Sequence, residues 1–73
     1  MGIDPQIATI LIRAVTTIGE EVAIAILHAI HGGDVNTVQQ LSKQLPGADQ
    51  IRLRDEALIA SQRAMAHDEG ERR

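Results

Sequence analysis

Histidines and nearby carboxylates are the residues in this chain whose types and spacing suit metal or acid–base chemistry. His28 and His31 lie three positions apart, so both imidazoles would point to one side of a helix. Glu21 precedes them by about two turns, and the run 67–69, His-Asp-Glu, follows near the C-terminus. A catalytic zinc site needs three protein ligands in fixed geometry, and neither HExxH nor Glu-x-x-His occurs. We interpret His28 and His31 as partners of a helix C-terminus and expect no metal or other cofactor.

Nucleophilic and general acid–base catalysis lack their usual residues. The chain has no cysteine, no glycine-rich phosphate loop and no recognisable Ser/His/Asp order. Ser42 and Ser61 are isolated serines on predicted helices, where we expect surface positions. Asp55 and Glu56 are adjacent and would point about 100° apart, so they cannot face one substrate as an acid–base pair. We therefore expect a protein that is not an enzyme.

The composition predicts one small domain, residues 1–73, that needs additional stabilisation. Cysteine and aromatic residues are both absent, so the core must be built from Ile, Leu, Val, Ala and Met. Domains of this size bury only about 60% of their unfolded surface. They usually depend on disulfides, a metal or a partner chain. With no disulfide available, the surface of a partner is the expected source of stability.

Asp4 and Pro5 mark the start of a long first helix, predicted over residues 5–31. Asp4 can cap it, and proline is favoured at the first helical position because its missing N–H has no helical partner there. We expect the helix to stop at Gly32, in the left-handed conformation that glycine tolerates. At 1.5 Å per residue it would span about 40 Å.

Two further helices are expected to complete an all-α fold, a helical hairpin or three-helix arrangement. After the turn at Gly32 and Gly33, Asp34 caps a short helix over residues 35–45. Pro46 and Gly47 form the next turn, because proline cannot continue the helical hydrogen bonds. An amphipathic third helix follows over residues 49–69, capped by Asp49. No segment alternates with the period of a strand.

The first helix carries more apolar surface than two helices of the same chain readily cover. Its apolar side chains fill an arc of roughly 200°, and two more aliphatic residues lie on the otherwise polar face. Apolar patches of this kind usually mark interfaces. The residues predicted to contact another subunit are Ile12, Ile24, Leu27, Ile30 and, from the third helix, Ile59. The alternative is a monomer in which Ile24 and Leu27 simply remain exposed.

The third helix has a narrow aliphatic stripe and, beside it, a row of smaller side chains. Ile51, Leu58 and Met65 repeat every seven residues and form the stripe. The neighbouring row consists of Leu53, Ala57, Ala60 and Ala64. Small residues in such a row permit close approach of another helix.

A DNA-binding function is the first alternative, because helix, glycine turn and short polar helix have the outline of a helix-turn-helix. The second helix would present Asn36, Thr37, Gln39, Gln40 and Lys43, and amide and hydroxyl side chains can contact base edges. However, Lys43 is the only cation in that helix, and ten acidic against seven basic residues give the chain a net charge of −3. Because phosphate neutralisation supplies most non-specific affinity, this charge disfavours nucleic acid as a partner.

Membrane association is the further alternative. A spanning helix needs about 20 predominantly apolar residues, whereas Arg13, Glu20 and Glu21 interrupt the first helix. Each central charge costs about 2.5–3.5 kcal/mol on insertion scales. A helix lying in the membrane interface is typically rich in Lys and Arg on its polar face, which this helix is not. The charges therefore disfavour a membrane partner.

The sequence favours a structural protein that self-associates or packs into a larger particle. A minor component of a virion is one assembly that would suit its small size. The N-terminus lacks the positively charged region and cleavage site of a secretory signal. We therefore expect a non-secreted protein, located in the cytoplasm or within an assembled particle.

Overall fold

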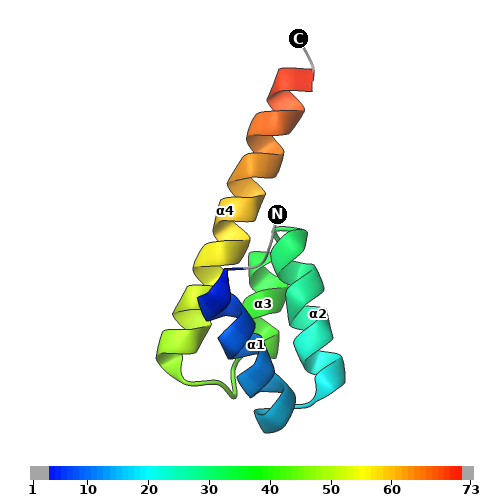
Figure 1. The fold of residues 1–73 in the computed structure, drawn as a ribbon. Coiled ribbons are helices and arrows are strands. Elements are labelled where there is room, and N and C mark those ends of the chain that lie inside the picture. The colour runs from blue at the N-terminus through cyan, green and yellow to red at the C-terminus, as the bar shows by residue number, and fades with distance from the viewer. Residues whose placement is uncertain (1–3, 72–73) are drawn as a thin grey trace.

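The chain folds into four helices (Figure 1). The computed structural model describes the backbone of residues 4–71 and side chains up to Met65. The helices are α1 (Pro5–Thr17), α2 (Glu20–His31), α3 (Val35–Leu41) and α4 (Gly47–Glu71), and residues 4–71 contain no strand. The all-α prediction is thus confirmed. The predicted count of three helices is wrong, because the region 5–31 forms two helices.

Gly19 divides the expected long helix. Its φ of 139° and ψ of 154° place it in a region of backbone space used almost only by glycine. The N–H groups of Ile18 and Gly19 both donate to the carbonyl of Ala14, which closes α1. Glu20 and Glu21 then occupy the first turn of α2, where the helix dipole favours negative charge. The chain therefore reverses here, and α1 and α2 form a hairpin (Figure 1).

The turn between α2 and α3 uses its two glycines differently from the prediction. Gly32 ends α2 with a right-handed φ of −82°. Gly33 has the left-handed conformation, with a φ of 70°. A Cβ atom built on Gly33 would lie 2.8 Å from the Cα and backbone nitrogen of Ser61 in α4. Gly33 thus brings the turn into close contact with α4, and Ser61 is half-buried rather than a surface residue.

The connection from α3 to α4 begins earlier than expected. Helix α3 ends at Leu41, four residues before the predicted end, and Ser42 is buried with its hydroxyl donating to the Val38 carbonyl. Pro46 directly precedes α4, and Gly47 is its first residue, so these two residues start a helix as well as ending a loop. Asp49 lies inside the first turn of α4 and is not its cap.

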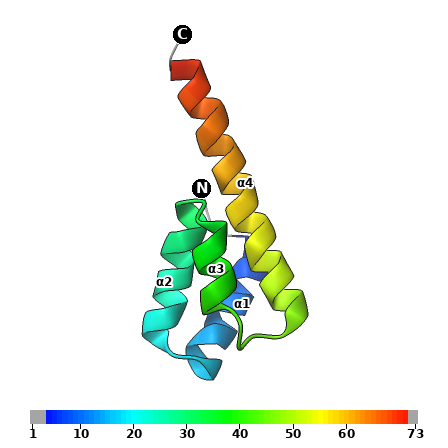
Figure 2. The same cartoon turned by 180° about the vertical axis from the view of Figure 1, so that it is seen from behind.

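Side chains from all four helices form one aliphatic core. Helix α3 packs between α2 and α4, and α1 contacts α2 and α4 (Figure 2). The buried apolar residues are Ile7, Ile10, Leu11, Ala14, Ala23, Ile26, Ala29, Ile30, Val38, Leu45, Leu53 and Ala57. The four alanines among them let the helices approach closely.

Helix α4 extends well beyond the other three helices (Figures 1 and 2). Its 25 residues correspond to about 38 Å at 1.5 Å per residue. The longest dimension of the molecule is 45 Å, against 23 and 21 Å for the others. From Gln62 to Met65 its described side chains are all exposed. The molecule is therefore a small bundle with a projecting helical arm.

Candidate interaction surfaces

The outward side of α4 carries the most extended row of exposed aliphatic residues along one helix. Leu53 and Ala57, from the row of smaller side chains, face the core. The stripe of Ile51, Leu58 and Met65 faces outward, with exposed fractions of 60%, 41% and 65%. Ile59 lies beside it and is also exposed. The stripe is thus an apolar surface that runs from the bundle onto the arm, and we call these four residues the α4 stripe.

The other residues predicted to contact a subunit divide into exposed and buried ones. Ile12 is 69% exposed on α1, and Ile24 is exposed on α2. Leu27 is only partly exposed and packs against the core, while Ile30 is part of the core itself. Ile24 and Ile30 are six positions apart on α2, about 240° around the helix, so they face different sides of it. Ile30 therefore packs within its own chain, and a contact of Ile30 with another subunit stays a prediction.

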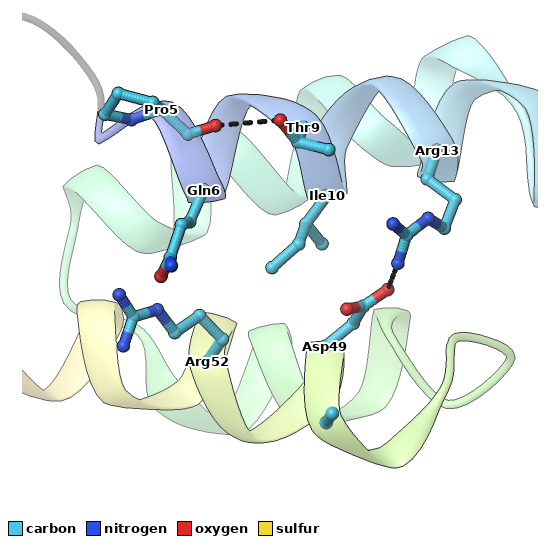
Figure 3. A pocket seen from close by; sticks show the side chains of 8 residues that line it. Pro5, Gln6, Thr9, Ile10, Arg13, Asp49 and Arg52 are labelled. Atoms are coloured by element: carbon cyan, nitrogen blue, oxygen red, sulfur yellow. Dashed lines mark hydrogen bonds and ion pairs between the residues drawn. The ribbon is translucent and has the colours of Figure 1, made fainter.

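A groove of about 430 Å³ lies between α1 and the first turns of α4 (Figure 3). Helix α1 contributes residues at helical spacing from its first three turns, and α4 contributes residues from its first two. The groove is lined by Pro5, Gln6, Thr9, Ile10, Arg13, Ala48, Asp49 and Arg52. The side chain of Ile10 points into its middle, and Gln6 and Arg52 approach each other at one end (Figure 3).

An ion pair closes the opposite end of this groove. The Arg13 guanidinium donates a 2.5 Å hydrogen bond to the Asp49 carboxylate and links α1 to α4. Asp49 is buried, whereas the Arg13 side chain is half exposed. Gln50 holds the preceding loop by donating to the carbonyls of Lys43 and Leu45. The start of α4 is thus anchored by polar contacts on both sides.

The polar face of α3 is exposed but carries little positive charge. Asn36, Gln39 and Gln40 on α3 are exposed, and so is Lys43, which lies in the loop after the helix. Thr37 instead forms hydrogen bonds within its own helix start. Its hydroxyl and backbone N–H both donate to the Asp34 carboxylate, at 2.6 and 3.1 Å. These two hydrogen bonds hold the pKa of the Asp34 carboxyl below its ordinary value. A negative charge at the start of a seven-residue helix does not favour contact with a phosphate backbone.

The histidines of α2 lie at its C-terminal end, and both are exposed. Among the described side chains, no three His, Asp or Glu residues come close enough to hold a metal ion. The predicted ligand candidates at 67–69 lie outside the described side chains. Within the described part of the chain, no helix has the length and apolarity needed to cross a membrane.

In the comparison with known proteins, no family model, curated protein or solved structure matches this chain. The sequence pattern identified the α4 stripe but not its orientation. The sequence pattern does not predict the groove, because Arg13 and Asp49 are 36 positions apart and the residues between them carry no signal for the pairing.

Proposed function

We propose that this protein is a non-enzymatic helical assembly subunit that self-associates through the α4 stripe. The single observation that carries the proposal is the exposure of Ile51, Leu58 and Met65 along two heptads of one helix. Residues seven apart stay on one side of a helix, as the contact residues of paired helices do. Burying this surface against a second copy would remove aliphatic area from water, worth about 25 cal/mol per Å².

Charge placement along the stripe favours a second copy of this chain as the partner. Arg54 and Asp55 are both exposed and, being adjacent, lie about 100° apart on opposite edges of the stripe. The structure gives neither of them an ion pair within the described side chains. In a parallel pair of α4 helices related by a two-fold axis, each Arg54 would face Asp55 of the partner subunit. This self-complementarity is what an isologous interface requires.

The projecting arm gives such a pair room to form. The exposed side chains from Gln62 to Met65 lie on the projecting arm, so two arms can approach without contact between the other helices (Figure 1). The small size of the fold and the lack of disulfides and aromatic residues add a reason for association. We also propose that this contact builds a larger particle, such as a virion.

The test is the native mass of the purified chain by analytical ultracentrifugation at micromolar concentration. The wild type is expected to sediment as a dimer or larger, and Leu58→Glu as a folded monomer, because Leu58 is exposed in the single chain. Ile12→Glu is the matched control, since it places the same charge at an exposed aliphatic residue on α1. A monomeric wild type would contradict self-association. Dissociation by Ile12→Glu but not by Leu58→Glu would instead place the contact on the α1 surface.

A further inference from the structure

We propose that the groove between α1 and α4 binds a small aliphatic monocarboxylate. In this proposal Arg52 and Gln6 hold the carboxylate, and Ile10 contacts the aliphatic body. The site is separate from the α4 stripe, and the proposal does not depend on self-association. Its volume of about 430 Å³ falls within the range of roughly 300–1,000 Å³ that is usual for small-molecule sites.

The charge of the lining favours an anion. Two guanidinium groups, of Arg13 and Arg52, stand against the single carboxylate of Asp49, so the groove carries a net charge of +1 in a chain of net charge −3. Arg13 and Asp49 already satisfy each other at one end. Arg52 is exposed and has no ion pair within the described side chains. Its guanidinium is therefore the group available to a ligand carboxylate.

The geometry of the polar groups favours a carboxylate over an anion that lacks paired oxygens. Arg52 and Gln6 converge from α4 and α1 on the same end of the groove, away from Asp49 (Figure 3). A guanidinium offers two parallel N–H donors that match the two oxygens of a carboxylate. The Gln6 amide adds one more N–H donor. The ligand carboxylate would thus be held without approaching the Asp49 carboxylate.

The middle of the groove requires an apolar ligand body. The side chain of Ile10 points into it between the two polar ends (Figure 3), and Pro5 and Ala48 add apolar lining. Thr9 does not compete for the ligand, because its hydroxyl donates to the Pro5 carbonyl at 3.0 Å. An aliphatic chain would cover these groups, which a fully polar anion such as phosphate cannot do. A short fatty carboxylate therefore matches both halves of the lining.

Hexanoate and its uncharged counterpart 1-hexanol provide the test, in a titration followed by the amide resonances of the ¹⁵N-labelled protein. We expect hexanoate to shift the resonances of Gln6, Thr9 and Arg52 saturably, and 1-hexanol to bind at least about tenfold more weakly. Arg52→Gln should weaken hexanoate binding by a similar factor. Arg63→Gln is the matched control, because Arg63 is exposed on α4 but does not line the groove. It should leave the affinity unchanged.

Three results would overturn the proposal. They are equal binding of hexanoate and 1-hexanol, equal binding of hexanoate and inorganic phosphate, and equal weakening by Arg52→Gln and Arg63→Gln. Far-UV circular dichroism establishes that each variant is folded before its affinity is compared. Leu58→Glu is expected to bind hexanoate like the wild type, since Leu58 lies outside the groove. Failure of this proposal is therefore distinguishable from failure of self-association.

Discussion

At Gly33 both the backbone conformation and the packing exclude a side chain. Its φ of 70° and the 2.8 Å approach to Ser61 act against any Cβ atom. We expect Gly33→Ala to lower the free energy of unfolding by about 1–3 kcal/mol. The neighbouring Gly32 has a φ of −82°, and its nearest contact for a Cβ is an ordinary 3.4 Å. Gly32→Ala should range from neutral to about 1 kcal/mol stabilising.

Urea unfolding followed by circular dichroism measures both glycine variants under the same conditions. The informative quantity is the difference between them, because each adds one methyl group to the same turn. Equal destabilisation by the two substitutions would contradict the assignment of the left-handed conformation to Gly33. It would also show that the close contact of this turn with α4 does not stabilise the fold.

Asp34 makes the cap of α3 dependent on pH. Hydrogen bonds from the Thr37 hydroxyl and N–H lower its pKa in the folded chain below the ordinary value of 3.8. The contribution of this carboxylate is therefore fully present above the ordinary value and is lost as the pH falls through the lowered pKa. Asparagine caps helices about as well but does not titrate. We expect the wild type to lose more stability than Asp34→Asn between pH 5 and pH 2.

Thermal unfolding of the wild type and Asp34→Asn across this range provides the measurement. Other carboxylates titrate in both proteins, so the difference between the two curves isolates Asp34. Curves that stay parallel down to pH 2 would show that the hydrogen bonds of Thr37 do not favour the charged carboxylate. Thr37→Val offers a second comparison, since it removes the hydroxyl donor and keeps the backbone N–H.

At the scale of the elements, the helices were predictable but the hairpin within residues 5–31 was not. A glycine within a helix costs only about 1 kcal/mol relative to alanine, so Gly19 alone is an ambiguous signal. The β-branched run from Val15 to Ile18, followed by Gly19 and two glutamates, has the composition of a helix stop and a new start. The continuous apolar pattern concealed this signal. Packing of α2 against α1 decides between the two outcomes.

The orientation of α4 depends on tertiary contacts in the same way. The sequence contains two rows on this helix, one of large and one of smaller aliphatic residues, and either can face a core. Within the second row Leu53 and Ala57 are buried, whereas Ala64 on the arm is exposed. The turn at Gly33 approaches the Ser61 backbone, so this side of α4 faces the bundle. The larger residues of the α4 stripe are left outside. The same limit applies to the groove, which exists only because α1 and α4 meet.

At the scale of the whole molecule, three short helices share an aliphatic core with one much longer helix. Three of the helices have 13 residues or fewer, and the fourth has 25. Helices of the shorter kind are marginal on their own and depend on tertiary packing. The long helix projects a surface that the bundle does not use (Figure 2). Folding and association of such a chain are expected to be thermodynamically coupled.

This coupling predicts a melting temperature that depends on protein concentration. Over a range in which the folded chain is dimeric, each tenfold increase in concentration should stabilise a subunit by about 0.7 kcal/mol. For a domain of this size, that corresponds to a rise of about 3–5 °C in Tm. Leu58→Glu should melt at a temperature independent of concentration, whereas Ile12→Glu should follow the wild type. A wild-type Tm that stays constant from 1 to 100 µM would separate folding from association and contradict the coupling.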